Sequence, residues 1–330
     1  MTELATVVFA AEAGAHLLDA PRSVRFSAFR RRFDEAAYLR DLSARGIAWI
    51  ARSDVSFPRR LAEIHDPPPG IFVRARTALS LEGLPIVAIV GARACSSYGM
   101  GVATELGREL AAAGVLVVSG LARGVDAAAH RGALQSGTTL AVLGCGIDRD
   151  YPRAHAALAG EIARRGWIVS EYPPGVEPAP WRFPARNRIV AGLAQATVVV
   201  EARERSGALI TADLALDEGR EVLAVPGEIT SQLSRGTNAL LRLGAVPVTC
   251  AADVLDVLGV EPPPPPEPAV LAEPLRAIRS LVADGSVGAD AIVRRTGLAA
   301  GTVAAALAEL ELLGLVTQSD GLYREVMGRT

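Results

Sequence analysis

Short apolar, β-branched runs alternate with Ala- and Leu-rich segments over most of this 330-residue chain. The runs recur at Ile86–Val90, Val115–Val118, Leu140–Leu143, Trp167–Val169, Val198–Val200, Val222–Val225 and Val246–Val248. The segments between them with helical spacing include Gly101–Ala113, Val125–Leu134, Ala156–Arg165 and Leu209–Asp217. Repeated strand–helix units with strands apolar on both faces form parallel sheets covered on both sides. We therefore predict an α/β fold built on a parallel sheet.

Glycine, serine and arginine are concentrated in the turns that follow four of these strands. The turns fall within Pro85–Gly99, Gly114–His130, Thr139–Pro152 and Ala196–Thr211. A turn of this kind before a helix directs backbone N–H groups and the positive end of the helix dipole at one place. Arginine adds forked donors that fit phosphate. Ligands of parallel sheets bind at the carboxyl ends of the strands, so we expect an extended anion-binding rim there.

The basic residues limit which phosphate sites are possible. All 34 are arginine, and the formal net charge of −2 gives no general argument for a polyanionic partner. Without lysine the chain has no P-loop lysine and no Schiff-base lysine. Gly144 and Gly146 supply only two glycines of a dinucleotide fingerprint, with Arg149 where the third would fall. We expect neither a nucleotide cofactor nor a metal.

Other catalytic arrangements are weakly supported. Ser119 lacks the nucleophile-elbow spacing. Asp126 and His130 lie one helical turn apart and could interact, but a helix-start carboxylate and a packed histidine are the favoured interpretation. Four acidic residues near the turns are candidate metal ligands: Asp148, Asp150, Glu201 and Glu204. For these, contact with water or arginine is the favoured interpretation.

The N-terminal residues are predicted to be helical. Residues 1 to about 45 have helical spacing around Leu4–Leu18 and Phe26–Leu42. The basic run at residues 30–32 is interpreted as a solvated helix face in preference to a binding patch.

Three scattered cysteines suit reduced thiols, and no apolar stretch approaches the roughly 18 residues of a membrane span. We expect a cytoplasmic protein.

A proline run at Glu261–Pro268 predicts a stiff spacer before a separate C-terminal part. Three short helices and a hairpin with an Asp-Gly turn are predicted after it: Leu275–Ala283, Asp290–Arg295, Thr302–Leu313 and Leu315–Val326. This order is typical of a winged helix.

The expected recognition helix, Gly301–Gly314, carries Glu309 and Glu311 and no basic residue. Such a helix would repel phosphate, although Arg294 and Arg295 precede it. Contact with a protein is therefore favoured over direct reading of DNA, which stays open.

The segment Trp181–Thr211 is the richest in binding chemistry. Residues 181–205 hold five arginines against two acids, and Arg186, Asn187 and Arg188 are expected just before a helix. The two arginines could clamp backbone phosphates, while the amide could bind a base or sugar. Trp181 and Phe183 could stack on bases. Alternatively, Arg–Glu pairs join helix to sheet and the aromatic rings lie in the core.

Six segments, in this order, resemble the DprA/Smf family of DNA-processing proteins. They are IVGARACSSYG, VVSGLARGVDAAAH, AVLGCGIDRDYP, SEYPPG, FPARNRIVAGLAQATVVVEARERSGALIT and AVPGEITSQLSRGTNALLRLGA. The resemblance spans roughly residues 46–250 and implies an extended Rossmann-like domain. The expected organisation has a helical, truncated SAM-like segment, the Rossmann-like domain, a proline-rich linker and a winged-helix domain. Their expected bounds are residues 1–45, 46–258, 259–273 and 274–330.

The resemblance also implies a function. It predicts a non-enzymatic homodimer that binds single-stranded DNA and helps to load RecA recombinase on it during natural transformation. Phosphate contacts would make the binding salt-sensitive and sequence-independent. Single-strand-binding protein is a further expected partner, and a membrane is not.

The resemblance assigns the binding residues by position. The usual Gly-Ser-Arg turn is Gly91-Ala92-Arg93 here, so one hydroxyl is replaced by a methyl group while the arginine remains. The implied phosphate- and DNA-binding residues are Gly91, Arg93, Ser119, Gly120, Arg123, Gly124, Arg153, Arg186, Asn187, Arg188, Ser206 and Gly207.

Two other functions remain in view. The first alternative is a nucleotide-processing enzyme of the Rossmann-like phosphoribohydrolase type, but its PGGxGTxxE motif is missing from PGEITSQLSRGTN and EARERSGALIT. A transcription regulator acting through the winged helix is disfavoured by the acidic recognition helix.

Overall fold

The computed structural model describes residues 3–13, 24–262, 271–285, 287–319 and 321–325. The chain forms two compact units, Met1–Pro262 and Pro263–Thr330. The helices before residue 45 therefore fall within the first unit, and the finer boundaries stay predictions. The predicted helix beyond Ala13, the middle of the proline spacer and Asp320 of the predicted Asp-Gly turn lie outside the described residues.

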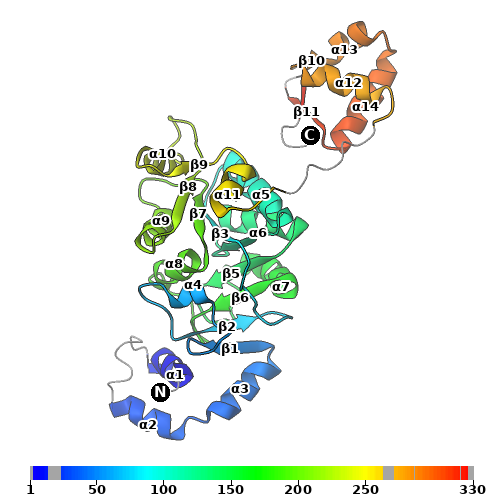
Figure 1. Cartoon of the computed structure of the whole chain (residues 1–330). Coiled ribbons are helices and arrows are strands. Elements are labelled where there is room, and N and C mark those ends of the chain that lie inside the picture. The colour runs from blue at the N-terminus through cyan, green and yellow to red at the C-terminus, as the bar shows by residue number, and fades with distance from the viewer. Residues whose placement is uncertain (1–2, 14–23, 263–270, 286, 320, 326–330) are drawn as a thin grey trace. The chain divides into compact units, whose positions relative to one another are not determined.

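The first unit combines three N-terminal helices with an α/β domain (Figure 1). The N-terminal helices are α1 (Glu3–Ala13), α2 (Val24–Arg32) and α3 (Glu35–Ala44). The strands are β1 (Ile47–Ala51), β2 (Gly70–Arg74), β3 (Ile86–Val90), β4 (Leu116–Ser119), β5 (Thr139–Leu143), β6 (Trp167–Ser170), β7 (Ala196–Val199), β8 (Glu221–Ala224) and β9 (Val246–Pro247). The helices of the domain are α4 (Arg59–Ala62), α5 (Ser97–Ala112), α6 (Val125–Ser136), α7 (Ala156–Arg165), α8 (Arg182–Leu193), α9 (Gly207–Asp217), α10 (Arg235–Arg242) and α11 (Ala251–Leu258).

The strands form one sheet in the order β1-β2-β6-β5-β4-β3-β7-β8-β9. From β6 to β9 all neighbouring strands are parallel, which confirms the predicted sheet. The chain moves outward from β3 in one direction to β4, β5 and β6, and then returns to the other side of β3 at β7. The edge between β3 and β7 is therefore the topological switch point, where α/β proteins bind ligands.

The strands β1 and β2 add an antiparallel edge to the predicted parallel sheet. Both join the sheet, but β1 pairs antiparallel with β2 and β2 pairs antiparallel with β6. Parallel strands need a long crossover, usually a helix. The connection from β2 to β3 contains no helix, so β2 runs opposite to the parallel strands.

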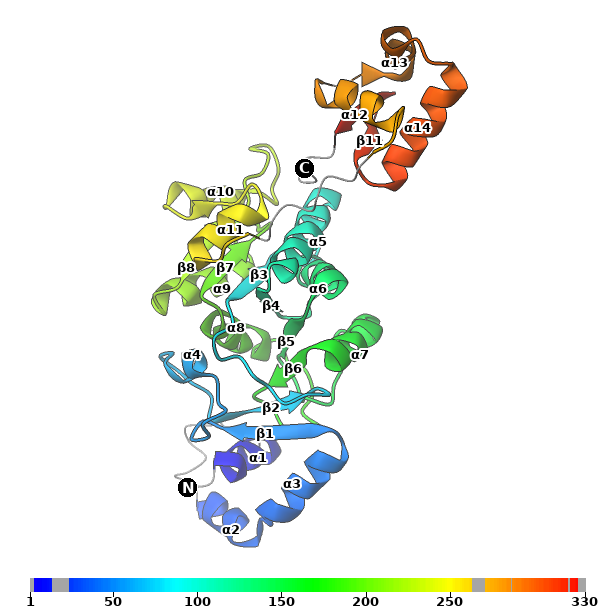
Figure 2. The ribbon, with the colours of Figure 1, turned by 45° about the vertical axis from the view of Figure 1, so that its right-hand side comes forward.

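Helices cover both faces of the sheet because its central strands are apolar on both sides. Ile86, Ala88 and Val90 of β3 pack with α4, α8 and α9 on one face. Val87 and Ile89 pack with α5, α6 and α11 on the other. Figure 2 shows α8 and α9 on one side of the central strands and α5 and α6 on the other. This double cover holds the turns at the strand ends in fixed positions.

The N-terminal helices share a core with the sheet. Phe9 of α1 contacts Phe26 and Phe29 of α2, with ring centroids 5.4 Å apart in both pairs. These rings belong to the cluster that includes Phe72 of β2 and Leu143 of β5. Burial of the aromatic rings thus fixes α1 and α2 against the β1–β2 side of the sheet.

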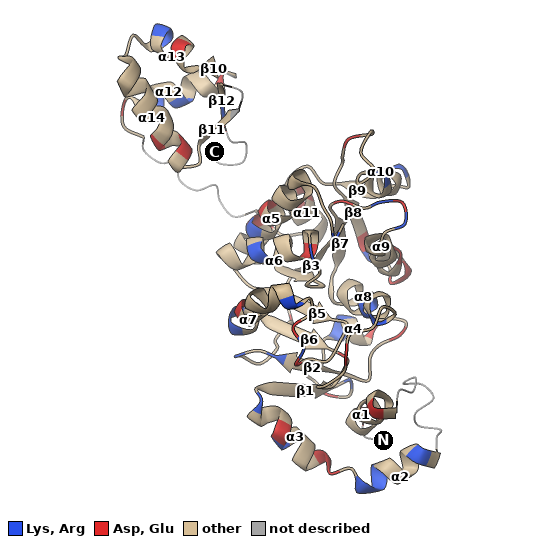
Figure 3. Ribbon diagram, turned by 180° about the vertical axis from the view of Figure 1, so that it is seen from behind, with Lys and Arg blue, Asp and Glu red and all other residues tan. Residues whose placement is uncertain are grey.

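The second unit has the predicted winged-helix order of helices and hairpin. Its elements are α12 (Leu275–Ala283), β10 (Val287–Gly288), α13 (Ala289–Thr296), α14 (Ala300–Leu312), β11 (Val316–Ser319) and β12 (Leu322–Glu325). Ile278, Val303 and Leu310 form its separate core. Figure 3 shows acidic and no basic residues on α14, the expected recognition helix.

The helices were also compared with the dimensions of a membrane span. In the described part of the chain no single helix is long and apolar enough to cross a membrane. The pair α13 and α14 passes that test only jointly, across a bend of 119°.

Candidate nucleic-acid interface

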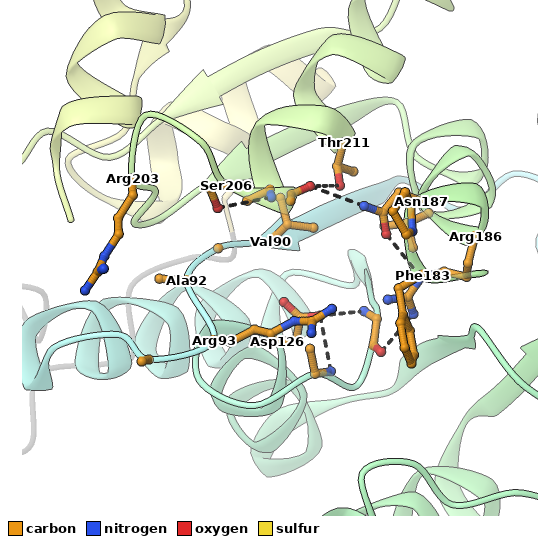
Figure 4. Close-up of a pocket in the computed structure, with 18 of the residues that line it drawn as sticks. Val90, Ala92, Arg93, Asp126, Phe183, Arg186, Asn187, Arg203, Ser206 and Thr211 are labelled. Atoms are coloured by element: carbon orange, nitrogen blue, oxygen red, sulfur yellow. Dashed lines mark hydrogen bonds between the residues drawn. The ribbon is translucent and has the colours of Figure 1, made fainter. Parts of the chain in front are cut away.

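A cavity of about 380 Å³ lies at the carboxyl ends of β3, β4 and β7. We call it the switch-point cavity. Its walls are the turns after these three strands together with α8, as Figure 4 shows. The cavity occupies the edge that strand order predicts for a ligand site.

The switch-point cavity brings together seven of the twelve predicted residues: Gly91, Arg93, Gly120, Arg186, Asn187, Ser206 and Gly207. Four arginines and one acidic residue are part of its lining: Arg93, Arg186, Arg203, Arg205 and Asp126. The formal charge of the lining is therefore strongly positive in a chain that is nearly neutral overall. Such a surface attracts an anion.

The turn before α6 is closed by a carboxylate from the first turn of that helix. Asp126 is buried and accepts hydrogen bonds from the backbone N–H groups of Gly120 (3.1 Å) and Ala122 (3.3 Å). Burial raises the pKa of Asp126, while the nearby Arg186 opposes that shift. The amide of Gly120, predicted as a phosphate donor, is already occupied.

The N-terminus of α5 is closed in the same way. Glu201 is buried and accepts hydrogen bonds from the backbone N–H (2.9 Å) and the hydroxyl of Ser96, which caps α5. Glu201 thereby fills the place that a ligand anion would take at this helix. Water or arginine is the contact predicted for Glu201, and the structure instead gives it Ser96.

The N-terminus of α9 is open toward the cavity. Ser206 caps it by accepting a hydrogen bond from the N–H of Ala208 (3.3 Å). The N–H of Gly207, the first residue of α9, has no acceptor among the described residues. Orphan N–H groups at a helix start bind anions with the help of the helix dipole.

Arg186 forms part of the wall of the cavity. It is buried, and its Nη1 donates to the carbonyl oxygens of Gly120 (2.8 Å) and Val142. Burial lowers the pKa of Arg186, an effect that Asp126 opposes. A Cβ atom at Gly120 would lie 2.3 Å from the guanidinium, so only glycine fits there without displacing it. Arg186 therefore fixes the turn after β4.

Arg188 points away from the cavity. Its guanidinium makes a two-pronged contact with Glu171 (2.8 and 2.7 Å), and its Nε donates to Asp66 (2.9 Å). The side chains of Arg188 and Glu171 are 13% and 3% exposed. Burial alone lowers the pKa of Arg188, but the hydrogen bonds to Glu171 together with the negative charges of Glu171 and Asp66 outweigh burial and raise the pKa. The alternative that an Arg–Glu pair joins helix to sheet fits Arg188.

Asn187 links α8 to the turn before α9. Its Nδ2 donates to the carbonyl of Gly207 (3.2 Å), and its Oδ1 accepts from Nε of Arg186 (3.3 Å). Arg186, Asn187 and Arg188 all lie inside α8, which starts at Arg182. The sequence predicts them just before a helix instead. The helix begins early because Pro184 is tolerated in a first turn.

Three predicted residues of the turn after β4 lie outside the cavity lining. The hydroxyl of Ser119 is buried and donates to the carbonyl of Ile89 (2.6 Å), so it does not face a ligand. Gly124 has a φ of 75°, and a Cβ atom there would lie 2.2 Å from the carbonyl oxygen of Ala92. Gly124 thus shapes the turn. Arg123 is exposed beside it.

Arg153 is also outside the lining. It lies in a short 3₁₀ helix, Arg153–His155, where it is exposed. The structure therefore separates Arg153 from the predicted residues that meet in the cavity.

Arg93 and the aromatic rings form a continuous stack at the mouth of the cavity. The guanidinium of Arg93 lies over the ring of Phe183, 5.4 Å from its centroid. The other neighbour of Phe183 is Tyr151, whose centroid is 5.3 Å away at an interplanar angle of 25°. Trp181 is 62% exposed and stacks with Arg182. Trp181 and Tyr151 are accessible to a base, in line with the predicted stacking role of Trp181, whereas Phe183 is half-buried between Arg93 and Tyr151.

Sequence reasoning missed Arg203 and Arg205 as individual site residues. Both are exposed in the turn between β7 and α9 and line the cavity. Figure 4 shows Arg203. The excess of arginine over residues 181–205 was the signal, because it included these two. Their position beside Ser206 could have selected them.

The remaining acidic and histidine candidates have partners within the protein. Nδ1 of His130 lies 2.7 Å from the hydroxyl of Thr139, so His130 does not bond to Asp126. Asp148 pairs with Arg45, and Asp150 pairs with Arg74. The favoured interpretations of these acids fit the structure.

Comparisons with known proteins agree with this architecture. The family model of DNA recombination-mediator protein A matches residues 48–259, and that of the DprA winged helix domain matches residues 261–321. The chain is 47% identical over 246 residues to the putative DNA processing protein DprA of Mycobacterium tuberculosis, covering 72% of this chain and 63% of that protein. The chain thus spans less than two thirds of this relative's length.

Two solved structures are similar as well. DNA processing protein A from Streptococcus pneumoniae is 37% identical with a TM-score of 0.65, covering 77% of this chain and 92% of that one. The protein from Helicobacter pylori, described for its single-stranded DNA binding mode, is 31% identical with a TM-score of 0.58, covering 64% and 95%. The strand order, the winged helix and these matches together show that the chain belongs to the DprA/Smf family.

Proposed function

We propose that the chain binds single-stranded DNA across the switch-point cavity without catalysing a reaction. The observation that carries this proposal is the set of free donors around the cavity. Arg93, Arg203 and Arg205 are exposed and have no ion-pair partner within the described ranges. They surround the open N-terminus of α9, which adds the N–H of Gly207.

The donors and the rings suit a flexible nucleic-acid strand. The three arginines contact successive phosphates, and Gly207 donates its N–H to one of them. Tyr151 and Trp181 are exposed and offer ring faces on which unpaired bases stack. Every base has such a face, so binding of this kind is sequence-tolerant. The DNA-binding mode described for the Helicobacter pylori relative supports this assignment.

The buried residues position this surface without touching the strand. Arg186 and Asp126 hold the turn after β4, and Arg188 ties α8 to Glu171. Ser119 and Arg188, which the resemblance implies as DNA-binding residues, are therefore not proposed as phosphate contacts. Arg123 and Arg153 extend it as exposed cations on a longer strand.

Family membership extends the proposal to cell biology. The chain acts in the cytoplasm as a homodimer that helps to load RecA on incoming single strands during natural transformation, and it also contacts single-strand-binding protein. The winged-helix unit makes a protein contact, because its α14 carries glutamates where a DNA reader carries cations.

The proposal is tested with labelled oligo-dT and fluorescence anisotropy. Arg93→Ala and Arg203→Ala are each expected to weaken binding about tenfold at moderate salt, since a charge-assisted contact is lost. Each should also reduce the slope of log affinity against log salt by about 0.7 per phosphate contact. Arg242→Ala, an exposed arginine of α10 outside the cavity, is the matched control.

Two results would overturn the proposal. Wild-type affinity in both cavity variants would place the strand elsewhere. Release of free base from nucleoside monophosphates would instead support the phosphoribohydrolase alternative, for which Asp126 is the one carboxylate of the described lining.

A further inference from the structure

A second cavity, of about 1030 Å³, lies at the amino ends of the parallel strands. We call it the amino-edge cavity. Ile86 begins β3, Arg220 directly precedes β8, and both line it. The switch-point cavity starts at Val90, the last residue of β3. The two cavities are therefore at opposite edges of the sheet, and the proposed DNA site does not include the amino-edge cavity.

The floor of the amino-edge cavity is apolar. Phe57, Leu81 and Leu193 line it and are buried against the core of the domain. They come from the loop before α4, the loop before β3 and the end of α8. Figure 1 shows α4 beside α8 at this edge. A ligand here would meet fixed apolar surface on one side.

Two arginines meet in the wall above this floor. Nη2 of Arg220 lies 3.5 Å from the carbonyl oxygen of Arg60, so the two residues are neighbours. Nε of Arg220 is buried and has no hydrogen-bond partner among the described residues. Burial lowers the pKa of Arg60, and the positive charge of Arg220 lowers it further. The two like charges thus repel each other within the wall.

No carboxylate of the described lining forms an ion pair with Arg60 or Arg220, although the charge of Glu63 partly offsets theirs. Glu63 is hydrogen-bonded to Arg59, on the same short helix, with Nε and Oε1 2.8 Å apart. The carboxylate of Asp54 accepts the backbone N–H of Ala51 (2.8 Å). Glu82 is exposed on the loop before β3 and forms no ion pair with a described residue. Apart from Nη2 of Arg220, the guanidinium groups of Arg60 and Arg220 consequently have no acceptor among the described residues.

We propose that the amino-edge cavity binds a phosphomonoester with a compact apolar body. The two guanidinium groups hold the phosphate, and the apolar body packs on Phe57, Leu81 and Leu193. A phosphate dianion neutralises both arginines, whereas a carboxylate neutralises one of them. Forked guanidinium donors match the geometry of phosphate oxygens.

Calorimetry on the full chain tests the site with three probes: phenyl phosphate, inorganic phosphate and benzoate. Phenyl phosphate should bind most tightly, because the other two lack the apolar body or the second charge. Arg60→Gln and Arg220→Gln should each weaken its binding about tenfold or more. Arg59→Gln removes an arginine that is already paired and should bind like the parent. Thermal melting without ligand identifies any variant that fails to fold.

The switch-point cavity is the competing site for the same probe. Loss of phenyl phosphate binding in Arg93→Gln, but not in Arg60→Gln, would place the phosphate there and overturn the proposal. Equal binding of benzoate and phenyl phosphate would also overturn it. Oligo-dT affinity should be unchanged in Arg60→Gln, which separates this proposal from the DNA site.

The phosphomonoester could be free or at a strand end, and competition separates these sources. Displacement of phenyl phosphate by 5′-phosphorylated oligo-dT, but not by its 5′-hydroxyl form, supports a strand end. Displacement by nucleoside monophosphates alone supports a small molecule. Failure of every phosphomonoester to displace it overturns the proposal.

Discussion

The buried polar layer beneath the switch-point cavity and the exposed rim around it use the same residue types in opposite ways. The buried layer consists of Ser119, Asp126, His130, Arg186 and Arg188. The rim consists of Arg93, Arg203, Arg205 and Gly207. Each polar side chain of the layer has at least one partner within the protein, whereas the rim arginines form no ion pair in the described part of the chain. The layer serves folding, and the rim is left for a ligand.

This difference shows why turns of similar sequence are not equivalent. Carboxylates of the chain lie at two of the three helix starts: Glu201 accepts from Ser96, the cap of α5, and Asp126 accepts from the turn before α6. Among these three helices, α9 is the one at whose start no carboxylate of the described residues accepts a hydrogen bond. The anion site is therefore defined by which helix ends the protein does not close itself. Changes in the layer should alter stability, and changes in the rim should alter binding.

The largest expected effect is on stability, from Arg188→Ala. The substitution leaves the carboxylate of Glu171 buried without its partner, so we expect the free energy of unfolding in urea to fall by about 3–5 kcal/mol. Adding Glu171→Gln should recover part of this loss. Arg165→Ala, which breaks an exposed pair with Glu161, should cost only about 0.3–0.5 kcal/mol. If Arg188→Ala has normal stability but binds oligo-dT tenfold more weakly, Arg188 contacts DNA and belongs with the rim residues.

A smaller change in the free energy of unfolding is expected when the pH is lowered, because His130 is buried. Burial lowers the pKa of His130 to about 3, whereas the unfolded chain titrates near 6.5. The unfolded state therefore binds a proton below about pH 6.5 that the folded state refuses until about pH 3. Stability should fall with decreasing pH in this window, by about 2 kcal/mol between pH 7.5 and pH 5.

Urea unfolding at several pH values measures this dependence. In His130→Gln the free energy of unfolding should depend much less on pH. Oligo-dT affinity should stay constant over the same range, because His130 is buried and does not belong to the rim. A pH dependence unchanged by His130→Gln would show that other groups cause it.

The sequence predicted the sheet better than the site, for a physical reason. The strand Ile86–Val90 and the helix Ala156–Arg165 were predicted at their observed bounds, because apolar pattern is local. The partners of polar groups are not local. Ser96 and Glu201, which are hydrogen-bonded, are 105 positions apart. The arginine pattern alone could not separate Arg188, which pairs with the buried Glu171, from Arg93, which forms no ion pair with a described residue. Which donors stay free is decided by packing of the whole domain.

The smallest expected effect is also the most specific for the rim, because it concerns one N–H group. Gly207→Pro removes the N–H at the first position of α9, where proline is tolerated and pre-organises the helix. Ser206 has φ −113° and ψ 143°, the extended conformation that a residue before proline adopts. We expect about fivefold weaker binding of oligo-dT with unchanged thermal stability.

Gly207→Ala is the matched control for this substitution. A Cβ atom at this position has no atom within 4 Å, so alanine keeps both the N–H and the space around it. It should bind like the parent. If proline and alanine bind equally well, the helix start of α9 does not contact phosphate, and the rim acts through its arginines alone. If both weaken binding, the strand passes so close to the α9 backbone that a methyl group obstructs it, and the contact is steric as well as electrostatic.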